Sequence, residues 1–497
     1  MKLELDLDTV DGYRTFLKVK SLPVYRFTGR EAWFPDEYAE RVGVSVSTEL
    51  ERSYSPRPWL FDYQRAIAAA AIEKRKFAVF ADCGLGKTAI ILEFARHALE
   101  SIAPGRKVLI VSPLMVCRQT VAEAMRFYGD DLPIEQVRSA QLCEWMTRPG
   151  GSRVGVTNYE AITDNLPNTS LVSALILDES SMLKSHYGKW GTRLIEMGRG
   201  LEWKLCATGT PAPNDRIEYA NHAVFLDHFP TVNSFLAKFF VNRGQTDNRW
   251  ELKPHALKPF YRALSHWCIF LSDPAVYGWK DNSAPLPPIN THIIDVELTS
   301  QQSDAAREAG GGLFGQSIGG IGGRGVMARI AKGIAPGGGS VESRKPAIVS
   351  ELANAGGESS IVWCKYNAEQ DALAELMPDA ANISGDTSDD ERERLIDEFK
   401  CGRRSVLISK PKILGFGLNL QVATRQVFST VQDSYEEYYQ AVKRSNRYGS
   451  KSPLDVYIPV TDLERPMLET VLRKASQIQA DTREQEALFK EVGCVAL

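Results

Sequence analysis

The chain has 497 residues, of which 43% are hydrophobic and 24% are charged, as in a globular protein with roughly two to four domains. The formal net charge of −3 excludes a uniformly basic nucleic-acid binder, so any positive surface for such a partner must be local. No apolar run reaches the ~18 residues of a membrane-spanning helix, and the N-terminal residues MKLELDLDTV contain no apolar signal core.

The eight cysteines include no C-x-x-C pair, and the seven histidines form no H-x-x-x-H pair. Structural zinc sites depend on such spacings, so the sequence argues against one. Several cysteines, such as Cys206 in LCATG, lie in apolar runs, which is typical of reduced thiols in a protein core. We therefore expect a cytoplasmic protein.

Residues 1–55 are polar and aromatic, and short alternating runs such as TFLKVK predict a small β-containing appendage. Residues 56–225 then open with the Ala-rich helix AIAAAAIEKR, a short apolar run, a glycine-containing turn and the helix TAIILEFARHALESI. Buried parallel strands are predicted at KVLIVSP, RVGVTNYE, ALILDE and, more weakly, KLCATGTP. Strands that alternate with helices predict a doubly wound parallel sheet with its loops at the carboxyl edge.

The strand-helix pattern weakens over residues 226–345, which hold the aromatic helical pieces FLAKFF and PFYRALSHWCIFL and a Gly-rich run. We interpret this block as a helical insertion and a flexible linker. A second series of strands, including SSIVWCKY, RSVLISK and LDVYIPV, occupies residues 346–460, and residues 461–497 predict a helical tail. The expected fold class is α/β, with two similar doubly wound lobes joined by a linker.

The run ADCGLGKT follows an apolar strand and opens a helix, which is the context that a phosphate-binding loop requires. Gly84 and Gly86 let backbone N–H groups around Leu85 turn toward phosphate oxygens. Lys87 supplies a cation to the β- and γ-phosphates, and Thr88 offers a hydroxyl to Mg²⁺. Ala81 stands where the general pattern has its first glycine, so a chance match in one turn remains the alternative.

The run LILDESS places two carboxylates at the end of an apolar strand. Asp178 can hold Mg²⁺, directly or through water, and Glu179 can orient and deprotonate an attacking water. The alternative is acidic capping of a helix N-terminus. That alternative loses weight because a phosphate loop lies upstream on the same predicted sheet.

Two further runs carry hydroxyl and guanidinium groups. ATGTPAPN follows an apolar strand and suits a loop that couples ATP to a bound strand, through Thr208, Gly209 and Thr210, although alone it fits any Pro-rich turn. In QAVKRSNRYG, Arg444 and Arg447 are expected on one face of a helix, where they suit a γ-phosphate bound by another domain. A solvated basic helix face is the competing interpretation.

Taken in order, these runs resemble the motifs of superfamily-2 helicases, and more closely those of the Swi/Snf-like branch, over roughly residues 56–460. The resemblance implies two RecA-like lobes. LFDYQ is similar to the adenine-reading motif and implies ATP-binding roles for Tyr63 and Gln64. VLIVSP and VTNYE resemble the motifs that touch the nucleic-acid backbone, which implies that role for the residues Ser112, Pro113, Thr157 and Asn158.

The resemblance continues in the second lobe. IVWCKY resembles motif IV, and GFGLNLQVATRQVFS resembles motif V, which implies coupling roles for Gly415, Gly417 and Asn419. QAVKRSNRYG resembles motif VI, where Gln440 is implied to contact ATP. The segment from Leu286, LPPINTHIIDVELTSQQ, is similar to the strand that leads into the second lobe of Swi/Snf-like proteins.

The sequence also departs from the family pattern. Ser181 replaces the motif II histidine and Ser185 the asparagine of that motif, while Lys443 replaces a glycine common in motif VI. Loss of the histidine puts the coupling of ATP to DNA in doubt, although not hydrolysis. The compact chain resembles bacteriophage and bacterial helicases more than eukaryotic remodellers, which implies the cytoplasm of a bacterium or of a phage-infected host.

The leading hypothesis is an ATPase stimulated by double-stranded DNA that uses ATP and Mg²⁺ to translocate along or remodel DNA, largely independently of sequence. A helicase that separates forked or branched strands is the alternative, and RNA is an open substrate because phosphate tracking carries little sugar information. A nucleotide-binding scaffold without turnover is disfavoured because Lys87, Asp178, Glu179, Arg444 and Arg447 are all present.

Overall fold

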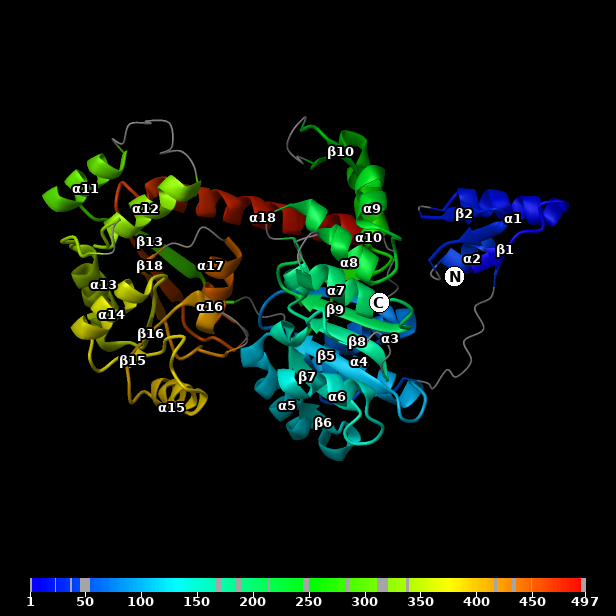
Figure 1. The fold of residues 1–497 in the computed structure, drawn as a ribbon, viewed down its shortest axis with the longest axis horizontal. Coiled ribbons are helices and arrows are strands. Elements are labelled where there is room, and N and C mark those ends of the chain that lie inside the picture. Colours follow the sequence, from blue (N-terminus) through cyan, green and yellow to red (C-terminus); the bar gives the residue numbers. More distant parts are fainter. Residues whose placement is uncertain are drawn as a thin grey trace. The chain divides into compact units, whose positions relative to one another are not determined.

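The structure is a computed structural model that describes residues 2–22, 24–35, 38–44, 54–166, 171–183, 189–212, 215–244, 250–281, 286–310, 321–336, 339–414, 418–430, 435–447 and 449–492. The chain forms two compact units, which we call the first lobe (Met1–Ser283 with Asp481–Leu497) and the second lobe (Ala284–Ala480) (Figure 1). No helix within the described ranges has both the length and the apolar character needed to cross a bilayer.

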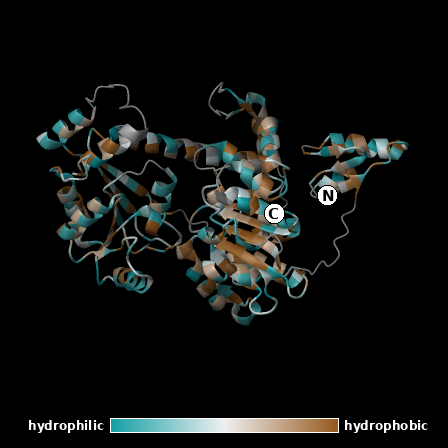
Figure 2. Cartoon of the chain, in the orientation of Figure 1, coloured by the Kyte–Doolittle hydropathy of each residue, from teal (hydrophilic) through white to brown (hydrophobic). Residues whose placement is uncertain are grey.

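The first lobe is built on a parallel sheet with the strand order β12-β4-β9-β8-β5-β7-β6. Its strands are β4 (Lys76–Ala81), β5 (Lys107–Ser112), β6 (Ile134–Gln136), β7 (Val154–Asn158), β8 (Val172–Asp178), β9 (Trp203–Thr208) and β12 (Cys268–Leu271). The central strands are mostly apolar and almost entirely buried because both faces of the sheet are covered, and Figure 2 shows them largely in the brown of hydrophobic residues.

Helices cover both faces of this sheet. One core, to which the β4 residues Phe77 and Val79 belong, contains residues of α3 (Asp62–Lys74), α4 (Lys87–Ser101) and α5 (Leu114–Tyr128). The alternate residues Ala78 and Phe80 belong to the other core, with residues of α6 (Leu142–Thr147), α7 (Lys189–Met197), α8 (Tyr219–Phe225), α9 (Val232–Phe239) and α10 (Leu257–Leu264). This is the doubly wound arrangement that the alternating strands and helices predicted.

Residues 226–283, which lie in the segment expected to be an insertion, form an integral part of the first lobe. Phe229, Phe235, Phe239 and Phe260 pack edge to face around α9 and α10, and β10 (Phe240–Asn242) pairs with β11 (Trp250–Leu252). The run HWCIFL, expected to be helical, instead supplies β12, which pairs in parallel with the phosphate-loop strand β4. A four-residue apolar run carries no period that separates a strand from a helix.

The N-terminal residues form the antiparallel sheet β1-β3-β2, with β1 (Lys2–Glu4), β2 (Arg26–Thr28) and β3 (Glu31–Trp33), together with α1 (Val10–Lys20) and α2 (Ala39–Val42). The run TFLKVK, which alternates like a strand, lies inside α1. Thr9 caps this helix by accepting a hydrogen bond from the backbone N–H of Gly12. The local cap, together with burial of Val19, outweighs the short alternating pattern.

The second lobe is built on a parallel sheet with the order β13-β18-β17-β14-β16-β15. Its strands are β13 (Ile289–Asp295), β14 (Ser360–Trp363), β15 (Ala381–Asn382), β16 (Val406–Ser409), β17 (Arg425–Phe428) and β18 (Leu454–Val460). Residues of α13 (Lys345–Asn354) and α14 (Asn367–Leu376) pack in one core. Residues of α15 (Asp389–Lys400), α16 (Pro411–Leu414), α17 (Tyr435–Val442) and α18 (Arg465–Val492) pack in the other.

The two sheets, each packed between helices, are the two doubly wound lobes that the sequence predicted. The strand from Leu286 is β13, and its pairing with β18 places it at the edge of the second sheet. The segment between β13 and α13 contributes α11 (Ser300–Gly310) and α12 (Ile321–Ala331) to the second lobe. The predicted helical tail is α18, which begins in the second lobe and ends in the first (red in Figure 1).

A buried cluster of three charged side chains lies at the start of α18. The Glu464 carboxylate accepts hydrogen bonds from Lys332 Nζ at 2.7 Å and from Lys345 Nζ at 2.6 Å, and all three side chains are buried. Burial acts to raise the pKa of Glu464, but the two ammonium groups outweigh it and lower the pKa to about 2. The carboxylate therefore holds together the ends of α12, α13 and α18.

We predict that Glu464→Gln destabilises the second lobe by ~3–5 kcal/mol, because two buried ammonium groups lose their counter-charge. Urea unfolding measures the change, and Glu469→Gln, at an exposed position of the same helix, is the matched control. In the wild type this stabilisation is present above the pKa of an unfolded glutamate, 4.5, and is lost as the pH falls toward about 2. Equal stability of the two variants near neutral pH would contradict the assignment.

Candidate active site

The loop expected to bind phosphate, called the phosphate loop below, connects β4, which ends at Ala81, to α4, which begins at Lys87. Gly86 has a φ of +69° and lies so close to Gln64 that a Cβ would come within 2.3 Å of its Nε2 atom. The Lys87 ammonium group donates to Ala81 O at 3.0 Å and to Asp82 O at 3.5 Å. Thr88 follows in the first turn of α4, which has no acidic residue, so the helix N-terminus suits an anion.

Tyr63 and Gln64 lie at the start of α3 and attach this helix to the phosphate loop. The Tyr63 hydroxyl donates to Leu85 O at 3.0 Å, and Gln64 Nε2 donates to the same oxygen at 3.3 Å. Asp281 accepts a hydrogen bond from the backbone N–H of Asp62 at 2.7 Å, which fixes the helix start from a distant part of the chain. The two residues expected to bind adenine are thereby placed beside the loop expected to bind phosphate.

Asp178 lies at the end of β8, where three hydrogen bonds hold its carboxylate and backbone. Ser112 Oγ donates to Asp178 Oδ2 at 2.9 Å, the Glu179 N–H donates to Oδ1 at 3.1 Å, and the Tyr159 hydroxyl donates to the backbone oxygen at 2.7 Å. Burial and the charge of Glu179 raise the pKa of Asp178 to about 6, against the opposing effects of Ser112 and the Lys87 charge. The site thus concentrates negative charge that a bound cation would neutralise.

Glu179 is buried and has a φ of +53°, a left-handed conformation that costs a residue with a Cβ on the order of 1–3 kcal/mol. Its Oε2 atom accepts a hydrogen bond from Thr208 Oγ1 at 3.0 Å. Thr208 also accepts from the backbone N–H of Thr210 at 3.1 Å, so the loop after β9 is tied to the glutamate. A Cβ on Gly209 would lie 3.4 Å from Ala81 O, which places this loop against the phosphate loop.

The residues expected to touch the nucleic-acid backbone lie at the carboxyl ends of β5 and β7. The Ser112 and Thr157 side chains are buried and make internal hydrogen bonds, from Ser112 to Asp178 and from Thr157 to Val137 O. Asn158 contacts Ser139 and Glu160, and Pro113 caps α5. Their nucleic-acid role stays a prediction.

In the second lobe, Arg444 and Arg447 do not lie on a helix, because α17 ends at Val442, and the expectation of a shared helix face is wrong. Their guanidinium groups nevertheless converge, since both donate to Leu418 O, at 3.4 Å and 3.2 Å. Gln440 is buried in α17, and its Nε2 atom donates to Glu436 Oε1 at 3.5 Å. Gly415 and Gly417 lie outside the described residues.

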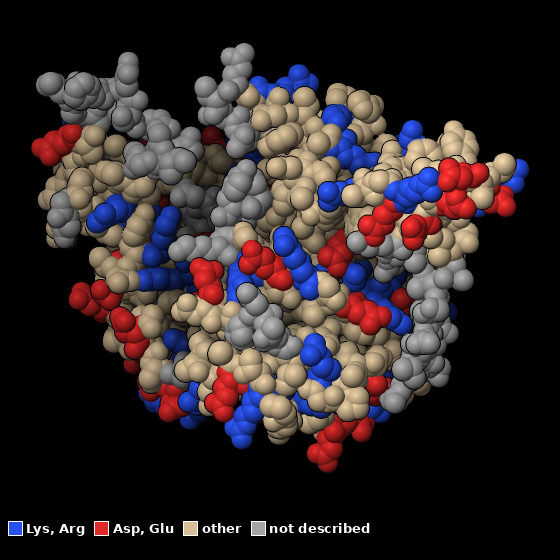
Figure 3. Space-filling view, turned by 45° about the vertical axis from the view of Figure 1, so that its right-hand side comes forward, with Lys and Arg blue, Asp and Glu red and all other residues tan. Residues whose placement is uncertain are grey.

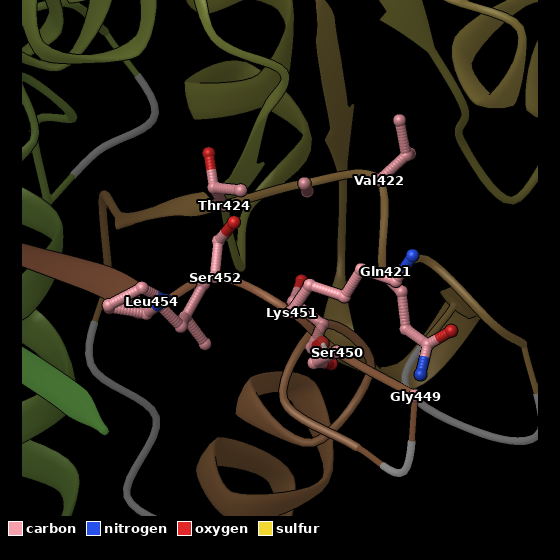
Figure 4. Close-up of a pocket in the computed structure, with 11 residues that line it drawn as sticks. Gln421, Val422, Thr424, Gly449, Ser450, Lys451, Ser452 and Leu454 are labelled. Atoms are coloured by element: carbon pink, nitrogen blue, oxygen red, sulfur yellow. Dashed lines mark hydrogen bonds between the residues drawn. The ribbon is translucent and has the colours of Figure 1, made fainter. Parts of the chain in front are cut away.

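A cavity of about 260 Å³ lies where residues 421–424 of the candidate motif V meet Ser445 and residues 449–454, at the end of and just after the candidate motif VI. Figure 4 shows Gln421, Lys451 and Ser452 among the side chains that line it. Asn419 and Gln421 form a compact turn, in which the Gln421 N–H donates to Asn419 Oδ1 at 3.1 Å, and Gln421 Nε2 reaches Arg447 O at 3.2 Å. The two motifs are therefore physically joined in this lobe.

Two family models match the chain, one in each lobe. The DEAD/DEAH box helicase model matches residues 61–217, and the helicase conserved C-terminal domain model matches residues 344–449. The chain is a superfamily-2 helicase. It is therefore a nucleic-acid-dependent ATPase, as the sequence predicted.

Curated relatives include protein p41 of Acyrthosiphon pisum secondary endosymbiont phage 1, which is 24% identical over 79% of this chain and 89% of p41. Eukaryotic initiation factor 4A of Dictyostelium discoideum is 29% identical, over 21% of this chain and 26% of the factor.

Two solved helicase structures are also similar to the chain. The Sulfolobus solfataricus SWI2/SNF2 ATPase core in complex with dsDNA matches with a TM-score of 0.40 and 18% identity, covering 89% of this chain and 97% of that one. S. cerevisiae Dbp5 bound to RNA and ADP BeF3 matches with a TM-score of 0.49 and 16% identity, covering 87% and 93%.

Two residues that contact the acidic turn of this helicase were not predicted as site residues. His222 of α8 contacts Ser180, and Tyr159 contacts the backbone of Asp178, yet neither was singled out as a site residue from the sequence. Tyr159 lies in a run expected to touch nucleic acid, and His222 lies in a helix without a motif. Only the folded chain brings them to the acidic turn.

We predict that Glu179→Gln still binds ATP but hydrolyses it ~10²-fold or more slowly, because the amide keeps the oxygen that accepts from Thr208 and loses the base. Nucleotide binding and ATPase rates measure the two effects separately. Glu144→Gln, at an exposed position of the same lobe, is the control and should match the wild type. Loss of ATP binding in Glu179→Gln would show a structural role instead.

Proposed function

We propose that this helicase uses ATP hydrolysis to move along or remodel DNA, largely without regard to sequence. The proposal is supported by one observation, the convergence of four side chains at the carboxyl edge of one sheet: Lys87, Asp178, Glu179 and Thr208. Thr208 donates a hydrogen bond to Glu179. That contact joins the candidate hydrolytic carboxylate to the loop expected to respond to nucleic acid.

In the proposed mechanism, backbone N–H groups of residues 84–88 hold the phosphates, and Lys87 swings from its carbonyl partners to the β- and γ-phosphates. The hydroxyl of Thr88 and the carboxylate of Asp178 are oxygen donors of the kind that suit Mg²⁺, and Ser112 orients the carboxylate. Bound Mg²⁺ would neutralise charge on the β- and γ-phosphate oxygens.

Glu179 orients a water and accepts its proton as the water oxygen bonds to the γ-phosphorus. The bond from that phosphorus to the β–γ bridging oxygen breaks, and ADP and phosphate are released. Thr208 holds the glutamate by its Oε2 atom, so movement of the following loop changes the position of the base. Gly209 and Thr210 are the proposed coupling residues on that loop.

We assign Arg444 and Arg447 to stabilise the charge that develops on the transferring phosphate, with Gln440 beside them. Both guanidinium groups already point to one place in their own lobe, the Leu418 carbonyl. Because the first lobe supplies only Lys87 as a phosphate cation in this scheme, hydrolysis requires both lobes. Nucleic acid that favours the competent state then stimulates turnover by shifting a population.

We assign Ser112, Pro113, Thr157 and Asn158 in the first lobe, and Asn419 in the second, to the nucleic-acid path. Gly415, Gly417 and Asn419 are the proposed coupling residues of the second lobe. The Swi/Snf-like motif resemblance favours DNA. Buried Ser112 and Thr157 side chains point to contacts made through the backbone at these strand ends. The interspersed acidic and basic side chains on the face in Figure 3 agree with local rather than global positive charge. Strand separation at forked DNA, or action on RNA, is the alternative.

We predict that duplex DNA stimulates the ATPase more than single-stranded DNA, forked DNA or RNA. Binding should be nearly independent of sequence and should weaken by roughly 10³-fold from about 50 to about 200 mM salt, because phosphate contacts release counterions. Fluorescence anisotropy and ATPase assays on the four substrates measure both properties. Stronger stimulation by forked DNA or RNA would favour the alternatives, and a tight, salt-insensitive preference for one sequence would refute the backbone path.

We predict that Arg447→Ala lowers DNA-stimulated turnover by ~10³-fold, the scale of arginine-finger losses, with little change in ATP affinity. Arg444→Ala should behave similarly, although its burial adds a loss of stability. Arg473→Ala, at an exposed position on α18, is the control. Retention of stimulated rates within about twofold, or ~0.4 kcal/mol of barrier, in both variants would rule out the two-lobe mechanism.

A further inference from the structure

The turn that carries Glu179 is hydrogen-bonded to helix α8 as well as to strand β9. Ser180 begins the short helix η5 (Ser180–Leu183), directly after the glutamate. Its hydroxyl lies 3.1 Å from His222 Nε2, and Asn221 Nδ2 donates to Leu183 O at the other end of η5. Adjacent residues of α8 therefore hold both ends of the segment that follows Glu179.

The imidazole of His222 is neutral and has one tautomer that satisfies its neighbours. It is fully buried, and burial lowers the pKa of His222 to about 4. With the proton on Nδ1, the ring can donate to the backbone oxygen of Glu218, which lies 3.4 Å away, and Nε2 can accept from Ser180 Oγ. We assign this tautomer because it satisfies both contacts.

The geometry around Glu179 needs such support. A glutamate with a φ of +53° is held in a conformation that the chain alone does not favour, and the surrounding contacts must compensate for it. Thr208 holds the side chain, while Tyr159 holds the preceding carbonyl of Asp178. The Ser180–His222 hydrogen bond holds the backbone that follows Glu179. The His222 ring packs edge to face against Phe80 of β4, with 5.2 Å between the ring centroids.

These contacts place the candidate coupling loop between two attachments to the same turn. The loop starts after Thr208, which donates a hydrogen bond to Glu179. It leads toward α8, where His222 is hydrogen-bonded to Ser180. The ends of the chain segment from β9 to α8 are thus both hydrogen-bonded to the turn that carries Glu179. The sequence has serine at 181, where the family pattern has histidine, whereas the structure supplies an imidazole to the neighbouring Ser180 from another helix.

We infer that His222 is a positioning residue for ATP hydrolysis, which acts through Ser180 to hold Glu179 in its left-handed, hydrolytically competent conformation. The inference rests on the proposed role of Glu179 and adds α8 to the coupling apparatus. His222 touches neither nucleotide nor water in this scheme. Its loss changes the rate of the chemical step and leaves the affinity for ATP intact.

The test compares His222→Phe, Ser180→Ala, the double variant and His222→Gln by kcat, the KM for ATP and thermal stability. His222→Phe and Ser180→Ala should each lower kcat by about 10- to 100-fold, the scale of small misplacements in an active site, with the KM for ATP little changed. The kcat of the double variant should be no lower than that of either single variant, because each single substitution already removes the Ser180–His222 hydrogen bond. His222→Gln, whose amide oxygen can accept from Ser180, should recover most of the rate.

His228→Phe is the matched control, since His228 is also a buried first-lobe imidazole but contacts Lys76 O and stacks on Trp267. It should lower stability and leave kcat unchanged. A wild-type kcat in Ser180→Ala, or additive losses in the double variant, would overturn the inference even if His222→Phe fails to fold. A wild type without ATPase activity, or an unimpaired Glu179→Gln, would instead refute the proposed function.

Discussion

The first lobe is organised around the burial of two adjacent carboxylates, Asp178 and Glu179, at the end of an apolar strand. Ionised groups in such a place are stable only when donors and cations surround them. Ser112 and the backbone N–H of Glu179 supply donors to the Asp178 carboxylate, Thr208 supplies one to the Glu179 carboxylate, and the Lys87 charge favours ionised Asp178. Each donor comes from a different strand end or loop, so the need to satisfy these acids draws the candidate motifs together.

The same constraint underlies the proposed coupling. In that proposal, movement of the loop that follows Thr208 changes the position of the buried glutamate to which Thr208 donates a hydrogen bond. Thr208 ties the start of the loop to Glu179, and His222 ties the helix that follows it to Ser180. In the second lobe the buried Glu464 has a structural role instead. Its carboxylate accepts hydrogen bonds from two lysines and so holds the ends of three helices together.

Much of the architecture could be predicted because the central strands of both lobes are short, largely apolar runs that a parallel sheet covered on both faces can bury. The failures have local causes. TFLKVK alternates like a strand but follows the helix cap Thr9, and HWCIFL reads as helical because four apolar residues have no period. Arg444 and Arg447 converge through the Leu418 carbonyl although the helix ends before them, which no spacing rule anticipates.

The sequence by itself determined the order of the motifs, the phosphate loop and the acids at the strand end, because these are contiguous runs whose residue types have specific chemistry. Only the tertiary structure decided which groups hold those acids in place. Ser112 lies 66 residues from Asp178, Thr208 lies 29 residues from Glu179, and His222 lies 42 residues from Ser180. Hydrogen bonds between residues so far apart depend on the strand order of the sheet and on the helix packed against it, and no local pattern records either.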